Sequence, residues 1–448
     1  MPDQYAQYRL LFLMVNAAMA LAPMFMSQAL FYFFPRAQTA KEKGLVLGNT
    51  LFFLMVTGAI SGVVIYPGLG LFPEKFYEIT HEKYLIPCFV CIWVVSTIID
   101  VLPNALNRIR SQAIVMLSLS VMRVFVVVYS AWSTGRVEYV FYALCLFAVI
   151  KAAVLIGYSY LSKDIGSLSL GLPKLKEQLS YSLPFGIAGG LYMLKVQADQ
   201  WIAAYQFSPK EYAIFTFGIY IAPLMTVLRT SINNAVLPEM SAAYAEEKYS
   251  EVASIFRRTN FLMALIILPI LAVLYATADS IISILFTKEY SGATPIMRIY
   301  IVGFVAQCLE SNSILRLTNA GKFWIKLNAI LLIVAAVFSY LGALFYGLPG
   351  AALGSVITLY FGEIISLVKA SNDLRIPFSK IIQWKKWSAL FCASFFSAFM
   401  GGLVAINVKG VAIFQMSVVT LSVLISYFAF VFILLPLPKL KLSPFKTK

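Results

Sequence analysis

Thirteen long apolar runs, separated by short charged or Pro/Gly-rich connections, follow one another along most of the 448 residues. A helix that spans the bilayer core needs about 20 mostly apolar residues. The chain is 60% hydrophobic and 12% charged, with a mean hydropathy of +0.83, whereas a typical soluble protein is roughly 25% charged. The predicted fold class is therefore an all-α polytopic membrane protein with about 13 transmembrane helices. The runs lie at 10–34, 45–66, 84–102, 113–132, 137–161, 181–205, 212–236, 258–286, 293–315, 323–345, 347–369, 387–406 and 412–435.

The 35 Lys and Arg residues are distributed unevenly between alternate connections. When the Lys-rich C-terminal tail is placed in the cytoplasm, most of the positive residues outside the apolar runs fall on that same side. Cytoplasmic loops of membrane proteins carry such an excess of Lys and Arg. The positive residues behind the formal net charge of +15 are therefore interpreted as setting the orientation of the chain in a membrane, with a cytoplasmic C-terminus. We expect no nucleic-acid partner.

Sequence features of enzymes are scarce in this chain. It has one histidine, His81, and five cysteines that all lie in apolar stretches, so we expect neither a metal site nor a cofactor. No nucleotide-binding P-loop is present. At Gly321-Lys322, Phe323 stands where the motif has Ser or Thr, and Arg316 stands where it has its first glycine. A membrane polysaccharide polymerase or ligase would need a long external loop, which the pattern does not provide. We expect no catalytic residues.

Four positive side chains lie inside the apolar runs, where each costs about 2.5–3.5 kcal/mol on insertion scales unless it faces a polar environment or a partner. They are Arg123, Lys151, Lys195 and Arg229. An excess of buried positive charge attracts anions. We predict that these four residues bind an anionic head group in a cavity, although structural pairing, and for Arg229 contact with lipid head groups, are alternatives.

Three acidic residues lie in the same kind of environment: Asp199, Glu310 and Glu363. Asp199 follows Lys195 by four residues, so the two share a helix face and are able to pair. Glu310 and Glu363 are candidates either for packing against Arg229 or for binding a proton or cation. The sequence leaves structural pairing and ion coupling open for all three.

Most of the chain, about 10–370, resembles the polysaccharide (O-antigen type) flippases of the multidrug/oligosaccharidyl-lipid/polysaccharide exporter superfamily. Each matching segment is short, but their order along the chain is that of the family. The segments are Ala29–Arg36, Ser182–Pro184, Trp201–Ala203, Tyr212–Phe215, Leu237–Ser241, Pro269, Ile284–Tyr290 and Gly347–Ala352.

The resemblance implies two pseudo-symmetric six-helix lobes around a central cavity, with two more helices after them. Here it implies an N-lobe at 1–161 with five visible helices, a cytoplasmic linker at 162–180 and a six-helix C-lobe at 181–370. Two additional helices and a basic tail follow at 371–448. Because the first run matches the family's second helix, we expect that the family's first helix is missing, which a misassigned start codon would explain.

The resemblance and the buried charges together predict a flippase in the cytoplasmic membrane of a bacterium. Its expected substrate is a polyprenyl-pyrophosphate-linked oligosaccharide for surface polysaccharide or lipopolysaccharide, moved by alternating access through a cationic cavity. Expected partners are this lipid-linked substrate, membrane lipids and other polysaccharide-assembly proteins. A peptidoglycan-precursor flippase and a multidrug/cation antiporter of the same superfamily are the alternatives, although an antiporter for cations favours an acidic cavity.

Overall fold

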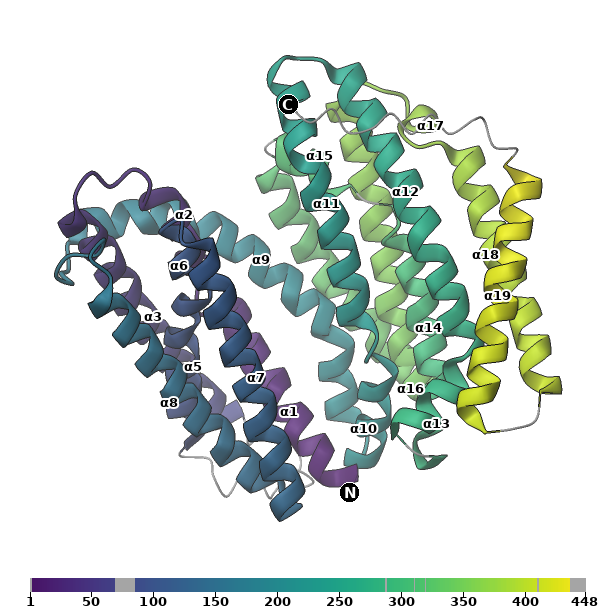
Figure 1. Cartoon of the computed structure of the whole chain (residues 1–448), viewed down its shortest axis with the longest axis horizontal. Helices are drawn as coiled ribbons and strands as arrows, with labels where there is room; N and C mark the ends of the chain where they lie inside the picture. The colour runs from purple at the N-terminus through teal and green to yellow at the C-terminus, as the bar shows by residue number, and fades with distance from the viewer. Residues whose placement is uncertain are drawn as a thin grey trace. The chain divides into compact units, whose positions relative to one another are not determined.

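The structure is a computed structural model that describes residues 2–68, 85–286, 288–309, 311–318, 320–408 and 411–435. All regular elements in these ranges are helices, which confirms the predicted all-α class (Figure 1). The helices pack into two compact units: residues 1–213 with 321–336, and residues 214–320 with 337–448.

The first unit is built from α1 (Pro2–Leu21), α2 (Met26–Phe33), α3 (Ala40–Gly68), α5 (Leu85–Ser96), η3 (Thr97–Asp100), α6 (Leu102–Ala105), α7 (Ile109–Thr134), α8 (Val137–Leu161) and α9 (Leu172–Gln206). The second unit contains α11 (Ala222–Ala245), α12 (Tyr249–Ala276), α13 (Ala278–Phe286), η4 (Lys288–Tyr290), α14 (Ala293–Ala306), α15 (Asn312–Leu317), α17 (Phe378–Ile381), α18 (Trp384–Asn407) and α19 (Ala412–Leu434). Two helices, α10 (Pro209–Gly218) and α16 (Gly321–Asp373), have residues in both units.

Ten helical segments among the described residues are long and apolar enough to cross a membrane. The 53-residue α16 counts once among them, although it contains two of the predicted runs. The more polar α9 is not one of the ten, and Ala293–Ala306 belongs to the shorter apolar helices. The chain is thus a multi-pass membrane protein with about ten apolar helices, and thirteen crossings remain a prediction.

The break between the predicted runs at 323–345 and 347–369 lies within α16, at Gly347. This residue has φ +64°, a left-handed conformation that glycine adopts without steric cost. The two halves approach so closely that a Cβ atom on Gly350 would lie 1.9 Å from the carbonyl oxygen of Gly342. The local sequence Gly-Leu-Pro-Gly therefore makes the bend, and two glycines permit the contact beside it.

Two other long runs are also divided. The run at 258–286 separates into α12 and α13 at Thr277, as expected of one crossing followed by a short helix, while Pro269 stays inside α12. The run at 10–34 separates into α1 and α2, and the positive φ angles of Met24 and Phe25 mark the break. Gly186 of α9 packs against that break, because its own Cβ position would lie 2.5 Å from the backbone of Met24.

The predicted linker at 162–180 differs from expectation, since it is helical from Leu172 onward. Gln178, on this helical part, donates a hydrogen bond to the Val46 carbonyl of α3 and accepts one from Asn49 at 3.0 Å. Asn49 also accepts from the backbone N–H of Gly171 at 3.0 Å. These buried polar contacts join the end of the linker and the first turns of α9 to α3.

The limits of the two compact units differ from those expected for the lobes. Helix α9 packs against α1, α2 and α3 and so groups with the first unit, whereas 181–370 was expected to form the C-lobe. Helices α18 and α19, expected as additions after 371, pack against α12 in the second unit. The division at 1–161, 162–180, 181–370 and 371–448 remains a proposal about how the lobes move.

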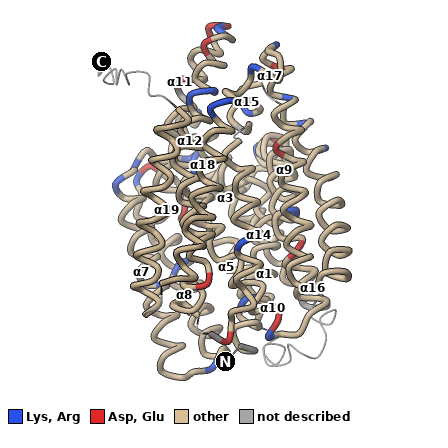
Figure 2. The backbone as a smooth tube through the Cα atoms, turned by 90° about the vertical axis from the view of Figure 1, so that its right-hand side faces the viewer, with Lys and Arg blue, Asp and Glu red and all other residues tan. Residues whose placement is uncertain are grey.

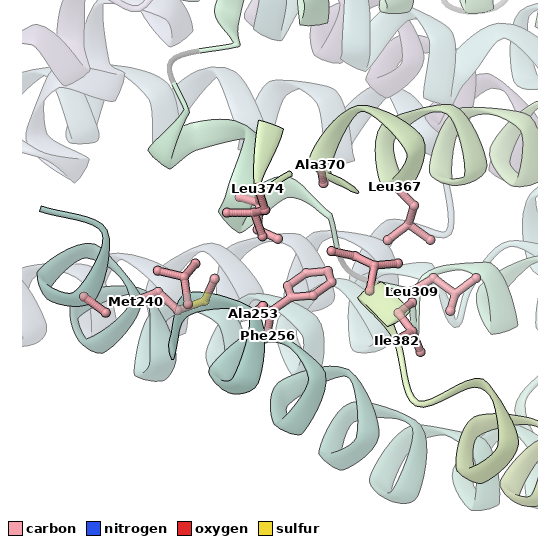
Figure 3. Packing of buried hydrophobic residues seen from close by; sticks show 12 residues of the cluster. Met240, Ala253, Phe256, Leu309, Leu367, Ala370, Leu374 and Ile382 are labelled. Atoms are coloured by element: carbon pink, nitrogen blue, oxygen red, sulfur yellow. The ribbon is translucent and has the colours of Figure 1, made fainter. Parts of the chain in front are cut away.

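A hydrophobic cluster holds one end of the second unit together (Figure 3). Phe256 of α12 is fully buried among side chains of α11, α16 and the segment around α17, including Met240, Leu367, Leu374 and Ile382. At the same end, the backbone tube of Figure 2 is coloured blue or red, for charged residues, at several places near the labels α11, α15 and α17. Arg316 and Lys380 lie in the last turns of α15 and α17. Charge is thus gathered at helix ends, as in membrane-spanning bundles.

Candidate functional site

Arg229 and Glu363 form a nearly buried ion pair within the second unit. The guanidinium Nη2 of Arg229, on α11, lies 2.9 Å from the carboxylate Oε1 of Glu363, on the second half of α16. The side chains are 10% and 12% exposed. Ser311 completes the contact, because its hydroxyl donates to Oε2 of Glu363 at 3.3 Å.

The pairing resolves one of the alternatives that the sequence left open for Glu363. A charge removed from water needs a partner, and loss of one member of a buried pair typically costs about 3–5 kcal/mol. Arg229 and Glu363 each provide that partner for the other, so Glu363 packs against Arg229. A guanidinium has five N–H donors in a planar fork, a shape that fits phosphate and carboxylate groups.

A second ion pair lies in the first unit. The Lys151 ammonium on α8 is 2.7 Å from Oδ2 of Asp100 at the end of η3. It also lies 5.9 Å from the centre of the Trp93 ring. The Arg123 guanidinium on α7 is 5.3 Å from the same ring centre and 5.5 Å from that of Phe12. Trp93 is therefore contacted by two of the four predicted cations.

Lys195 and Asp199 both lie on α9 but have different environments. The Lys195 ammonium is 4.8 Å from the centre of the Tyr192 ring, which in turn stacks with Trp324 at 6.2 Å between centres. Asp199 is 1% exposed, and one carboxylate oxygen accepts a hydrogen bond from the backbone N–H of Gln200 at 2.7 Å. Direct pairing between Lys195 and Asp199 remains a prediction. Glu310 lies outside the described residues.

The structure brings together some of the predicted residues and adds others that the sequence did not point to. Arg229 meets Glu363, while Lys151 meets Asp100, which the sequence placed only near a helix end. The aromatic partners Trp93 and Phe12 were missed because rings in apolar runs are normally interpreted as core. Their signal would have been an unmatched cation, Arg123, which needs a π-face when no carboxylate is beside it.

These contacts change the electrostatic character expected for the site. Two of the four cations, Arg229 and Lys151, are each neutralised by a carboxylate. An anion that binds either one must compete with, or add to, the carboxylate already present.

Comparison with known proteins agrees with this architecture. Residues 2–295 match the family model described as polysaccharide biosynthesis protein. The capsular polysaccharide biosynthesis protein CapF of Staphylococcus aureus is 24% identical over 199 residues, which cover 44% of this chain and 49% of CapF. The chain thus spans about half the length of this curated relative.

Solved structures with the same fold are transporters. An inward-facing multidrug resistance MATE family transporter of the MOP superfamily has a TM-score of 0.72 at 15% identity, covering 84% of this chain and 91% of that one. The Lipid II flippase MurJ in an inward closed conformation has a TM-score of 0.71 at 15% identity, covering 96% and 91%. A MOP superfamily transporter from Pyrococcus furiosus, described as having a binding pocket of reverse polarity, has a TM-score of 0.60 at 15% identity, covering 84% of this chain and 88% of that one.

The family model covers well over half of the chain, and the helical architecture is that of MOP superfamily transporters. The chain therefore belongs to the polysaccharide biosynthesis protein family, and its fold is similar to those of the MATE transporter and the MurJ flippase.

Proposed function

We propose that the protein moves a polyprenyl-pyrophosphate-linked oligosaccharide from the inner to the outer leaflet of a bacterial cytoplasmic membrane. The observation that carries this proposal is Arg229, a nearly buried arginine on a membrane helix of a polysaccharide biosynthesis family member. A pyrophosphate is an anion whose oxygens suit the guanidinium fork. The name of CapF, a capsular polysaccharide biosynthesis protein, supports a surface polysaccharide as the final product.

Exchange of partners at Arg229 supplies the mechanism. Glu363 holds the guanidinium of Arg229 in place in the structure. The pyrophosphate takes over part of this contact by accepting from the guanidinium N–H groups. Movement of the helices then exposes the head group to the other side of the membrane by alternating access, while the lipid tail stays in the bilayer.

The other candidate residues take supporting roles in this proposal. Lys195, Arg123 and Lys151 would attract the anionic head group through a cationic cavity, and the rings beside them would stack on sugars. Asp199 and Glu310 are proposed for ion coupling or structural pairing. Further proposed partners are other polysaccharide-assembly proteins.

Deletion of the gene tests the substrate. We expect a lipid-linked oligosaccharide to accumulate on the inner leaflet and to disappear when the wild-type gene is restored. If no lipid-linked sugar accumulates, the flippase proposal is wrong. Accumulation of the peptidoglycan precursor instead would identify the alternative substrate, and increased sensitivity to cationic drugs without sugar accumulation would indicate an antiporter.

A further inference from the structure

A cavity of about 850 Å³ lies within the second unit, among α12, α13, α14, α18 and α19. Its size falls in the range of small-molecule sites, about 300–1,000 Å³. Helix α12 ends at Ala276, α18 ends at Asn407 and α19 begins at Ala412. Since all three are membrane-spanning candidates and the cavity reaches their ends, it lies at the level of lipid head groups.

One part of the cavity wall carries a matched pair of charges. Arg298 of α14 donates to Oδ2 of Asp279, in the first turn of α13, at 2.8 Å. Its guanidinium also lies 5.4 Å from the centre of the Tyr275 ring. Both charged side chains are partly open, with exposures of 36% for Arg298 and 69% for Asp279. They therefore retain donors and acceptors for a ligand.

The remaining wall is apolar, with Phe399 and Leu403 of α18 as examples. Gly402 leaves further space, because a Cβ atom added there would meet no atom within 4 Å. An apolar wall beside one positive and one negative side chain suits an amphiphile whose head group carries both charges. A head group with net negative charge would have to approach the Asp279 carboxylate, which opposes binding.

We propose that this cavity binds a zwitterionic phospholipid with a primary ammonium, the chemistry of phosphatidylethanolamine. Its phosphate contacts Arg298, and its ammonium donates to Asp279. The acyl chains lie along the apolar wall. The charge distribution along the sequence puts this end of the helices outside the cytoplasm, so the lipid belongs to the outer leaflet.

Native mass spectrometry of the full-length protein in detergent tests the proposal. The delipidated protein is offered phosphatidylethanolamine, phosphatidylcholine and phosphatidylglycerol with identical acyl chains at equal concentrations. We expect at least fivefold more bound phosphatidylethanolamine than either other lipid. Phosphatidylcholine is disfavoured because its quaternary ammonium has no N–H to donate to Asp279. Equal retention of the three lipids, or preference for phosphatidylglycerol, would overturn the proposal.

Variants locate the site. Gly402→Phe fills the cavity and should lower bound phosphatidylethanolamine at least fivefold, whereas Gly402→Ala should not. Asp279→Ala should remove the preference over phosphatidylcholine, because it removes the acceptor for the ammonium. Arg136→Gln, which removes an exposed charge from another part of the chain, serves as control. A folded Gly402→Phe protein that binds as much lipid as wild type, or an Asp279→Ala protein that keeps the preference, would contradict the assignment.

Discussion

Arg229 and Glu363 depend on each other because each is nearly buried and the other supplies its opposite charge. In the first unit Lys151 is likewise nearly buried beside a carboxylate, but its partner Asp100 is 30% exposed. Sequence alone identified Arg229, Lys151 and Glu363 as unusual, since charged residues inside apolar runs need a polar partner. It could not choose the partners, because Arg229 and Glu363 are 134 residues apart and several carboxylates competed for the pairing.

The interdependence of Arg229 and Glu363 is measurable as a coupling energy. We expect Arg229→Gln and Glu363→Gln each to reduce the free energy of unfolding by about 3–5 kcal/mol, because each leaves a buried charge unpaired. The double variant should lose clearly less than the sum of the two. Thermal unfolding in detergent checks this. The exposed pair Lys174–Glu177 is the matched control and should show a coupling of about 0–1 kcal/mol; equal coupling in both pairs would contradict this interdependence.

Helices α3 and α9 are joined by a buried polar contact rather than by apolar side chains alone. Asn49 and Gln178 are both fully buried, and each bonds to backbone as well as to the other. The lysines and glycines of 162–180 indicated a linker. The helix nevertheless begins at Leu172, and Gln178 on its second turn adds hydrogen bonds to buried groups of α3.

Removal of this contact should destabilise the first unit. We expect Gln178→Leu to lower the free energy of unfolding by about 1–3 kcal/mol, since Asn49 and the Val46 carbonyl each lose one buried hydrogen bond. The control is Asn407→Leu, at an exposed amide that bonds only within its own helix end. Thermal unfolding of both variants in the same detergent tests this. An equal decrease in stability for the two variants would show that the α3–α9 contact does not stabilise the first unit more than an exposed hydrogen bond does.

Gly→Ala substitutions should change stability in opposite directions at the bend in α16 and at an open position in α8. Gly350→Ala places a Cβ atom 1.9 Å from the Gly342 carbonyl oxygen, so the helices must separate and the melting temperature should fall by several degrees. Gly157→Ala, in α8, meets no atom within 4 Å and should raise stability by about 0.5–1 kcal/mol. A Gly350→Ala protein as stable as wild type would show that the two halves of α16 do not pack as described.

Hydropathy predicts the fold class of the whole molecule better than it predicts the helix breaks and the limits of the compact units. Apolar runs predicted an all-helical membrane protein, and the predicted boundary between the runs 323–345 and 347–369 coincides with the bend at Gly347. The break after α1 was not predicted, because its left-handed residues, Met24 and Phe25, are not of the type that normally adopts positive φ. The grouping of α9 with the first unit depends on long-range packing, which hydropathy does not contain.

Orientation in the membrane is a prediction for the molecule as a whole. The excess of Lys and Arg in alternate connections predicts that Lys163 is cytoplasmic and Arg136 external. A cysteine introduced at 136 should react with a membrane-impermeant maleimide in intact cells, whereas one at 163 should react only after the cells are permeabilised. The wild-type chain, with its own five cysteines, gives the background. The reverse pattern would invert the proposed topology.

The rate at which proteoliposomes translocate a labelled polyprenyl-pyrophosphate oligosaccharide tests the central proposal most directly. Arg229→Gln combined with Glu363→Gln keeps the buried site neutral but removes the guanidinium. We predict at least a tenfold lower rate for this double variant at equal reconstitution. Lys174→Gln, which removes an exposed charge, should translocate like wild type. A double variant that translocates at the wild-type rate would contradict the role proposed for Arg229.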